Sequence, residues 1–248
     1  MGIFWKIVNK VIRDADIILE VLDSRFIDES RNKEIEDKIE RNGKVLIHVI
    51  NKCDLVDPKY LNKKKNSLTN CVFVSSTVHH GFTKLREKIL IVGKRAFGKD
   101  EFIVGVVGYP NTGKSSVINA LSGRRKAPTS SRSGFTKGVM KVKADNKIRL
   151  LDTPGVLPFD ETDELRLVLL GSKNFDQIKN PDYIAESLIE NNKDLIKSYY
   201  DVPEATGEEM LESIALKFNF VKKGNTPDIE RTARHIMRDW QVGKLWKS

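Results

Sequence analysis

Short apolar runs alternate with amphipathic segments over the first 110 residues of the chain. Each run is almost uninterrupted, which is typical of parallel strands that are buried on both faces. The predicted strands are residues 17–22, 45–50, 71–74 and 102–107. The intervening segments space their apolar side chains as helices do. The predicted helices are residues 3–14, 30–42, 59–66 and 81–90. The alternation predicts an α/β fold, with a mostly parallel sheet covered by helices on both faces.

The pattern changes after residue 90. Residues 91–101 contain two glycines and several charges, which predicts a surface connection. Residues 122–138 are polar and basic, which predicts a long flexible loop. Apolar stretches at 139–144 and 147–151 flank an Asp-Asn pair, and this arrangement predicts a β-hairpin.

Strand signals end at about residue 163 and helical patterns follow. The predicted helices are residues 164–171, 181–191, 193–200, 207–219 and 227–240. The last of these is expected to begin with Thr226 as its N-cap, followed by Pro227. We therefore expect two domains, an α/β domain at residues 1–162 and a small all-α domain at residues 163–248.

The composition is that of a globular protein with an excess of basic residues. The chain has 248 residues and a formal net charge of +9, which suits a polyanionic partner such as nucleic acid. It contains no apolar run of 18 residues, which excludes a membrane span, and no cleavable signal is visible. Cys53 and Cys71 have neither the number nor the spacing of a disulfide framework or a metal site. We expect reduced thiols in a cytoplasmic monomer.

The segment GYPNTGKS at residues 108–115 lies between a predicted strand and a predicted helix. Glycines let the backbone curl so that several N–H groups point at one anion, and the helix adds its positive N-terminus. Lys114 is expected to reach the β- and γ-phosphates of a nucleotide, and Ser115 to bind Mg²⁺. A chance loop with the same spelling is the alternative, which the strand before it and the helix after it disfavour.

The segment NKCD at residues 51–54 follows a predicted strand, where open α/β sheets bind ligands. The carboxylate of Asp54 can accept from two N–H groups on the edge of guanine, whereas adenine presents an acceptor there. Asn51 can hold the purine and the neighbouring loop, and the stem of Lys52 can lie along the ring. An ordinary polar turn is the alternative for this segment taken alone.

The segment DTPG at residues 152–155 also follows a predicted strand. Asp152 is expected to hold Mg²⁺ through water, and the N–H of Gly155 to meet the γ-phosphate. A turn that starts a helix is the alternative, and the presence of the other two motifs disfavours it.

The three motifs resemble those of the translation-factor-related GTPases, which have a P-loop NTPase fold. The loop at 75–77 resembles the one whose backbone contacts the guanine carbonyl, and Thr136 resembles the switch I threonine that completes the magnesium shell, with Thr129 as a weaker rival. The resemblance implies catalytic roles for Lys114, Thr136 and Gly155, and magnesium ligands at Ser115, Thr136 and Asp152. It implies nucleotide contacts from Asn51, Lys52, Asp54, Ser75, Ser76, Asn111, Thr112, Gly113, Lys114, Ser115, Ser116 and Gly155.

The motifs occur in an unusual order. In most GTPases the phosphate-binding loop comes first and NKxD last. Here NKCD and residues 75–77, which we call the serine loop, precede residues 108–115, which we call the phosphate loop. This order resembles the circularly permuted GTPases, most closely the YlqF/YawG type that is linked to ribosome assembly. The segments at 15–25 and 109–116 are similar to hallmarks of that family, and the resemblance covers about residues 8–160. That family also carries an α-helical C-terminal domain, which here would follow directly on the nucleotide-sensing loop.

Two residues qualify the chemistry. Val156 stands where many GTPases have a glutamine that orients the attacking water, so we expect slow intrinsic hydrolysis. Asn111 resembles an asparagine that binds a K⁺ ion bridging the phosphates, and a role in shaping the loop is the alternative.

The last helix places basic side chains opposite an apolar face. Residues 217–248 hold eight Lys and Arg against three Asp and Glu, and Arg231, Arg234 and Arg238 share one face. We expect this stripe to contact ribosomal RNA, and a solvated side of a packed helix is the alternative. His48 is expected to be a core residue, and no histidine has the spacing of a metal site.

The leading hypothesis is a Mg²⁺-dependent GTPase that acts as a switch in ribosome assembly and binds a ribosomal subunit or its RNA. A P-loop ATPase or kinase is one alternative, which NKCD disfavours. A nucleotide-gated RNA-binding scaffold with little turnover is the other, and Val156 and the basic tail favour it.

Overall fold

The computed structural model describes residues 3–65, 68–123, 140–152 and 164–246. The chain divides into two compact units, residues 1–161 and 162–248, which we call the sheet unit and the helical unit. The predicted flexible loop lies almost wholly outside the described residues, as do four residues to which the sequence assigns switch or catalytic roles. These are Thr129, Thr136, Gly155 and Val156.

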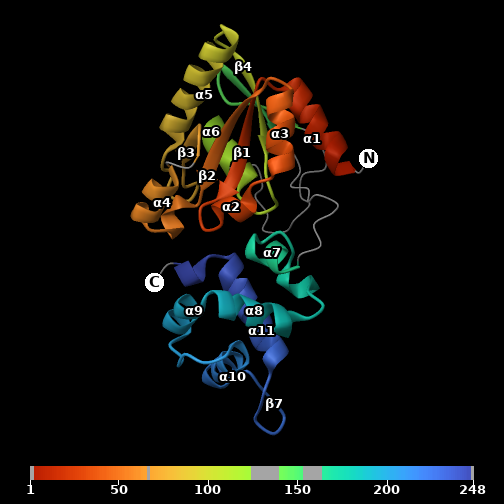
Figure 1. The fold of residues 1–248 in the computed structure, drawn as a ribbon, viewed down its shortest axis with the longest axis vertical. Helices are drawn as coiled ribbons and strands as arrows, with labels where there is room; N and C mark the ends of the chain where they lie inside the picture. The colour runs from red at the N-terminus through yellow and green to blue at the C-terminus, as the bar shows by residue number, and fades with distance from the viewer. Residues whose placement is uncertain (1–2, 66–67, 124–139, 153–163, 247–248) are drawn as a thin grey trace. The chain divides into compact units, whose positions relative to one another are not determined.

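The sheet unit is built on a six-stranded sheet (Figure 1). Its strands are β1 (Ile17–Asp23), β2 (Val45–Asn51), β3 (Cys71–Phe73), β4 (Phe102–Val107), β5 (Met140–Lys143) and β6 (Ile148–Asp152). They lie in the order β3-β2-β1-β4-β6-β5, and every pair is parallel except the hairpin β5–β6. The predicted α/β class and mostly parallel sheet are confirmed.

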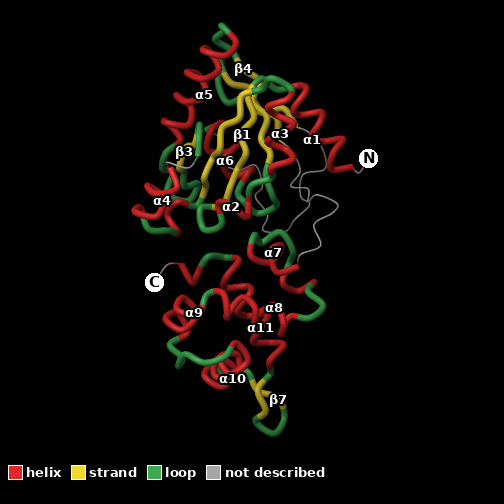
Figure 2. The backbone as a smooth tube through the Cα atoms, in the orientation of Figure 1, coloured by secondary structure: helices red, strands yellow, loops and turns green. Residues whose placement is uncertain are grey.

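Helices cover both faces of this sheet (Figure 2). On one face lie α1 (Ile3–Asp14) and α3 (Lys33–Arg41), and on the other α5 (Phe82–Phe97) and α6 (Lys114–Ser122). Because successive residues of a strand point to opposite faces, Ile18 packs with α1 and α3 whereas Leu19 packs with α5 and α6. Shorter elements complete the unit. They are α2 (Ile27–Ser30), η1 (Cys53–Leu55) and α4 (Pro58–Lys65).

The helix α5 is longer than its sequence pattern predicts. The prediction of a surface connection from residue 91 is wrong up to residue 97, where the helix ends against Gly98 with φ +65°. Gly93 is buried inside the helix, because a Cβ there would lie 2.7 Å from the ring of Phe102 and 2.9 Å from Ile17. This glycine therefore allows the helix to approach the sheet closely and does not break the helix.

The helical unit consists of α7 (Glu164–Leu169), η2 (Phe175–Gln177), α8 (Pro181–Asn191), α9 (Lys193–Tyr200), α10 (Gly207–Lys217), α11 (Ile229–Gln241) and η3 (Lys244–Trp246). Its core contains fully buried side chains from all five of the α-helices named here, including Leu188, Ile214, Met237 and Trp240. A small hairpin, β7 (Val221–Lys222) and β8 (Thr226–Pro227), interrupts the helices, so the expectation of helices alone is wrong there.

The start of α11 also differs from its prediction. Thr226 and Pro227 belong to β8, and the N-cap is Asp228, whose side chain accepts from the backbone N–H of Arg231 at 3.2 Å. Both Thr and Asp are good N-caps. Thr226 pairs with Lys222 of β7, so the helix begins later and Asp228 becomes its N-cap.

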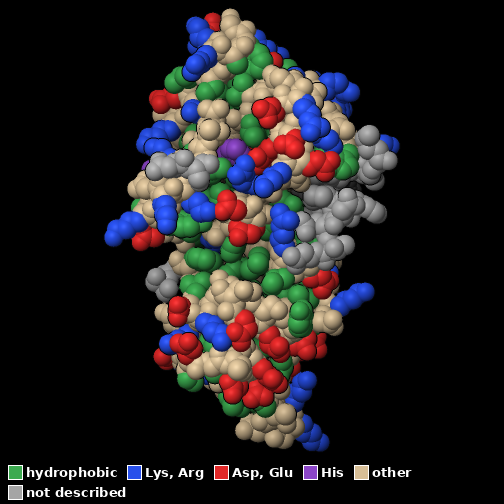
Figure 3. Space-filling view, in the orientation of Figure 1, with side chains coloured by type: hydrophobic (Ala, Val, Ile, Leu, Met, Phe, Trp, Pro, Cys, Tyr) green, Lys and Arg blue, Asp and Glu red, His purple; other side chains and the backbone are tan. Residues whose placement is uncertain are grey.

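The two units carry different charge. Residues 1–161 hold 30 Lys and Arg against 19 Asp and Glu, whereas residues 162–248 hold 13 against 15. Figure 3 shows acidic side chains gathered on the helical unit over α8 and α10. The basic excess of the chain therefore lies in the sheet unit, and the basic end of the helical unit is balanced by acidic residues before it. Among the described residues, no helix has the length and apolar character needed to cross a membrane.

Candidate nucleotide site

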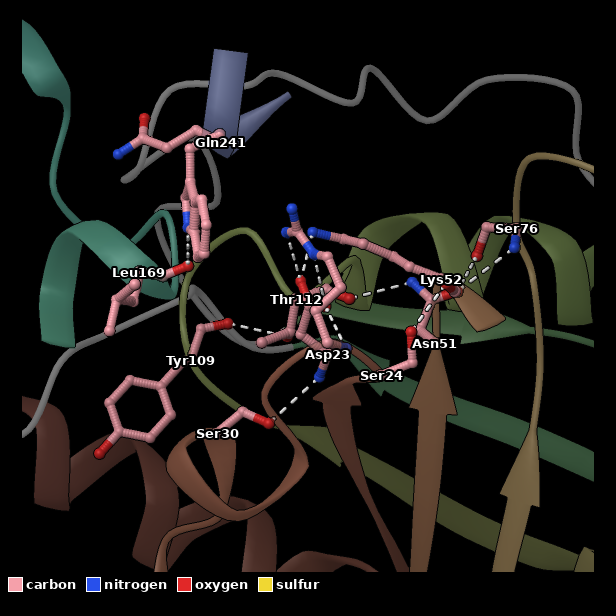
Figure 4. Close-up of polar contacts among 12 residues, drawn as sticks. Asp23, Ser24, Ser30, Asn51, Lys52, Ser76, Tyr109, Thr112, Leu169 and Gln241 are labelled. Carbon is pink, nitrogen blue, oxygen red and sulfur yellow. Dashed lines mark hydrogen bonds and ion pairs between the residues drawn. The ribbon is translucent and has the colours of Figure 1, made fainter. Parts of the chain in front are cut away.

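The carboxyl ends of β1, β2, β3 and β4 meet at one edge of the sheet, as adjacent parallel strands must. The segments that leave these ends include NKCD, the serine loop and the phosphate loop. Three motifs that lie far apart in the sequence are therefore brought to one edge (Figure 4).

The phosphate loop leaves β4 and curls tightly. Gly108, Asn111 and Gly113 all have positive φ, at 142°, 60° and 98°. Lys114 donates from Nζ to the carbonyl oxygens of Gly108 (2.8 Å) and Tyr109 (2.6 Å), so its ammonium lies against the first residues of the loop. The hydroxyl of Thr112 donates to the same Tyr109 carbonyl at 2.9 Å. The loop thus holds a cation at its own carbonyl groups, beside the N-terminus of α6.

Two glycines of this loop are required by their surroundings. A Cβ on Gly113 would lie 2.1 Å from the side-chain nitrogen of Asn51, and one on Gly108 would lie 2.5 Å from the carbonyl oxygen of Val21. Ser115 and Ser116 occupy the first turn of α6 and are half-buried.

Asn51 ends β2 and joins the loops of the site. It is 2% exposed and donates from Nδ2 to the carbonyl of Thr112 at 2.9 Å. Its Oδ1 accepts from the hydroxyl of Ser76 at 3.0 Å and from the N–H of Ser76 at 3.3 Å. Figure 4 shows Asn51 between Thr112 and Ser76. One amide therefore connects the phosphate loop with the serine loop.

The serine loop is closed by backbone hydrogen bonds. Ser75 and His80 exchange both of their N–H···O bonds, at 3.1 and 3.0 Å. The N–H of Cys53 donates to the carbonyl of Val74 at 3.1 Å, which ties NKCD to this segment. Asp54 follows in η1 with an exposed side chain. An exposed carboxylate beside an ordered loop can accept hydrogen bonds from a purine edge.

Lys52 is held by a group whose role the sequence analysis missed. Asp23, at the end of β1, is fully buried, and its Oδ2 lies 2.8 Å from Nζ of Lys52 and 2.8 Å from the guanidinium of Arg25 (Figure 4). The other oxygen of Asp23 accepts from Nε of Arg25 at 3.0 Å. The hydroxyl of Ser24 donates to the carbonyl of Lys52 at 2.7 Å. The sequence signal that could have revealed this network is the pair Asp23 and Arg25, at the end of the predicted strand that precedes the one leading into NKCD.

This network controls the charges of its members. Burial alone would raise the pKa of the Asp23 carboxyl, but the cations of Lys52 and Arg25 outweigh it and hold that pKa well below its usual range. Burial lowers the pKa of the Lys52 ammonium, and Asp23 opposes this effect. Asp23 is thus the anion that favours the charged form of Lys52 and holds this side chain in place within the guanine motif NKCD.

Asp23→Asn is expected to destabilise the fold by about 3 kcal/mol, because it leaves the buried guanidinium of Arg25 and the partly buried ammonium of Lys52 without their anion. Unfolding in urea, followed by circular dichroism, measures this loss. The contribution of Asp23 in the native chain should be complete above the unfolded pKa of about 3.9 and disappear as the pH falls through the lower folded pKa.

Asp100→Asn is the matched control for this substitution, because Asp100 pairs with Lys94 where both side chains are mostly exposed. We expect it to change stability by less than about 1 kcal/mol. Equal stability of the Asp23 and Asp100 variants would contradict the proposed role of Asp23.

The magnesium side of the site is described in part. Asp152 ends β6, the strand next to β4, and Ser115 lies in the first turn after the loop that β4 enters. A hydroxyl and a carboxylate are hard oxygen donors, which suit Mg²⁺. The other predicted contributors, Thr136 and Gly155, lie outside the described residues, and their roles stay predictions.

Comparison with known proteins places these motifs in a family. The sequence profile of the family described as "50S ribosome-binding GTPase" matches residues 103–217. The chain is 44% identical over 246 residues to an uncharacterized GTP-binding protein of Methanocaldococcus jannaschii, covering 97% of this chain and 65% of that protein. It is 32% identical to a guanine nucleotide-binding protein-like 3-like protein of Mus musculus, covering 98% of this chain and 48% of that protein. The chain thus spans about half to two thirds of the length of these relatives.

A solved structure agrees with the chain along almost its full length. GDP-bound YlqF of T. maritima superposes with a TM-score of 0.70 at 25% identity, covering 96% of this chain and 94% of that one. The permuted order of the motifs along the chain, with NKCD on β2 and the phosphate loop after β4, accords with this match. In fold and in the order of its motifs, the chain is thus similar to the circularly permuted GTPase YlqF.

Proposed function

We propose that this chain binds GTP and GDP with Mg²⁺, hydrolyses GTP, and works as a nucleotide-dependent switch in ribosome assembly. The observation that carries the proposal is the position of Asn51, whose single amide joins the phosphate loop to the serine loop. Such a bridge sets the distance between a base site and a phosphate site. The likeness to these GTP-binding proteins supports the same function.

Guanine is proposed to be selected at the end of β2. Asp54 presents an exposed carboxylate. The ammonium of Lys52 is held by Asp23, which would keep the stem of Lys52 beside the base. Adenine would leave the carboxylate without its two donors, which is the kind of mismatch that gives strong discrimination.

The phosphates are proposed to occupy the phosphate loop. The ammonium of Lys114 would exchange the carbonyl oxygens of Gly108 and Tyr109 for phosphate oxygens, while N–H groups at the start of α6 stabilise the negative charge. Mg²⁺, held by Ser115 and Asp152, would neutralise charge on the β- and γ-phosphates. Val156 has no group that can orient water, so we propose slow hydrolysis until a partner supplies one. A K⁺ ligand at Asn111 stays a prediction.

The ribosomal partner is proposed from the family description and from charge. Arg231 and Arg238 are exposed on α11, with Arg231 stacked on the ring of Phe220 at 4.4 Å. Arg234 differs, because it is half-buried and donates to the carbonyls of Phe175 and Ile178 and to Glu230. We therefore narrow the RNA-facing stripe of α11 to Arg231 and Arg238, and assign Arg234 to the folding of the helical unit.

Co-sedimentation with isolated ribosomal subunits tests this proposal. We expect more binding with a non-hydrolysable GTP analogue than with GDP. Arg231→Glu with Arg238→Glu should weaken particle binding by about tenfold or more, because two phosphate contacts are lost and reversed in sign. The affinity for GTP should not change. Lys193→Glu with Lys197→Glu is the matched control, with the same charge change on α9.

The outcomes separate the parts of the proposal. Unchanged particle binding in the Arg231 and Arg238 variant would refute the role of α11 and leave nucleotide binding untouched. A strong rise in hydrolysis when subunits are added is expected of a switch. Its absence would favour the alternative, a nucleotide-gated scaffold with little turnover.

A further inference from the structure

A buried cluster of ionisable side chains lies away from the nucleotide site. Glu20 on β1 and His48 on β2 are register partners of adjacent parallel strands, so their side chains leave the same face of the sheet. Glu36 reaches them from α3. Glu20 is completely buried, His48 is 5% exposed, and the side chain of Glu36 is 13% exposed.

Two of the three facing atoms of this cluster have no hydrogen-bond partner. His48 Nε2 lies 3.5 Å from Glu20 Oε2 and 3.6 Å from Glu36 Oε1. Within the described part of the chain, Glu20 Oε2 and His48 Nε2 are buried side-chain atoms without a hydrogen-bond partner. Leaving a buried polar atom unpaired costs about 1–3 kcal/mol, so two such atoms facing one another indicate a missing ligand between them.

The other atoms of the same side chains are all engaged. His48 Nδ1 lies 3.3 Å from the carbonyl oxygen of Thr69, which can only accept a hydrogen bond, so in the neutral ring Nδ1 carries the proton and Nε2 the lone pair. Glu20 Oε1 accepts from the N–H of Asn32 at 2.9 Å. Arg31 donates to both oxygens of Glu36, at 2.7 and 2.6 Å. Outer hydrogen bonds of this kind orient the ligands of metal sites.

We propose that Glu20, Glu36 and His48 bind a divalent transition-metal ion, for which Zn²⁺ is the best match. Their three ligand atoms lie within 4.8 Å of one another. Tetrahedral Zn²⁺ with bonds of about 2.0–2.1 Å separates its ligands by about 3.4 Å, which agrees with the two measured distances of 3.5 and 3.6 Å. Imidazole favours Zn²⁺ over Mg²⁺ or Ca²⁺.

The charge of the cluster points the same way. Arg31 compensates Glu36, so Glu20 is the group that lacks a counter-charge. A cation between the three side chains would supply it. Water entering beside Glu36, which has the most exposed side chain of the three, would complete the four ligands.

The bound ion would have a structural role, because its ligands come from three different elements. It would link β1, β2 and α3 three residues before Asp23 and Asn51, or about 10 Å along the strands. The site would thus brace the part of the sheet that carries the guanine motif, and it is independent of the proposed ribosomal function.

Metal binding to the full chain tests the proposal. After dialysis against a chelator, in buffer with excess Mg²⁺ and no nucleotide, the chain is titrated with Co²⁺ and then Zn²⁺. We expect one equivalent of Co²⁺ with the strong visible absorption of tetrahedral coordination, displaced by one equivalent of Zn²⁺. Zn²⁺ should raise the Tm by about 5 °C. Absence of a bound equivalent would overturn the proposal and assign the gap to a shared proton.

Variants and a direct view of the ligands identify the site. His48→Gln and Glu20→Gln should lose the bound equivalent, whereas His79→Gln with His80→Gln, both exposed, should keep it. Cys71→Ser should also keep it. X-ray absorption of the Zn²⁺-loaded native chain should show one imidazole and oxygen ligands at about 2.0–2.1 Å. This measurement does not depend on any variant folding, and sulfur ligands or unchanged binding by the His48 variant would overturn the proposal.

Discussion

Asp54→Asn is expected to lower the affinity for GTP by about a thousandfold, because a site built to hydrogen-bond one base rejects a mismatch by several kcal/mol. The carboxylate accepts from two N–H groups of guanine, and an amide can accept from only one of them while its NH₂ group opposes the other. Xanthine carries an oxygen at that second position, so the variant should gain affinity for xanthosine triphosphate. Equilibrium titration with fluorescent analogues of both nucleotides measures the loss of affinity for GTP and the gain for xanthosine triphosphate.

Asp57→Asn is the control for this substitution. Asp57 is also exposed, lies three residues further on, and accepts from the N–H of Lys59 at 2.6 Å, a role that Asn can keep. Its affinity for GTP should equal that of the native chain. If Asp54→Asn bound GTP normally, the assignment of NKCD to the base would be wrong.

Gly113→Ala is expected to reduce the affinity for GTP and GDP by at least a hundredfold, about 2.7 kcal/mol. Its Cβ would lie 2.1 Å from the amide nitrogen of Asn51, on a backbone with φ +98° that L side chains rarely adopt. Asn51 would have to leave its bonds to Thr112 and Ser76. Both the phosphate loop and the serine loop would then lose their common support. Isothermal titration calorimetry with GDP measures the effect.

Gly123→Ala separates backbone strain from the clash. Gly123 follows the same helix α6 and also has positive φ, at +65°, but a Cβ there meets nothing within 4 Å. This variant should lose about 1 kcal/mol of stability and bind GDP as the native chain does. A similar loss of affinity in both variants would refute the role given to the Asn51 bridge.

The apolar pattern predicted the sheet because buried strands and amphipathic helices each leave a local pattern in the sequence. The prediction failed where the role of a residue depends on a contact with a residue far away in the sequence. Gly93 was interpreted as a loop residue, yet it accommodates the ring of Phe102. Thr226 and Asp228 are both good N-caps, and only the β7–β8 pairing decides between them.

The site shows the same division. Motif spacing predicted which segments carry the chemistry, but it could not predict the partners of Asn51, which lie 61 and 25 residues away. Nor could it predict that Asp23 would hold Lys52. The cluster of Glu20, Glu36 and His48 was missed because its members come from three elements at irregular intervals. Only the pairing of β1 with β2 and the position of α3 bring them together.

The strand order β3-β2-β1-β4-β6-β5 has a consequence for biosynthesis. The sheet separates into two halves that are each continuous in the chain, β1–β3 with the guanine motif and β4–β6 with the phosphate loop and Asp152. Among the described strands, the pairing of β1 with β4 joins the two halves. Vectorial synthesis therefore delivers the base-recognising half first, and the phosphate-binding half docks onto its open edge at β1. In a GTPase with the usual motif order, the phosphate loop would emerge first.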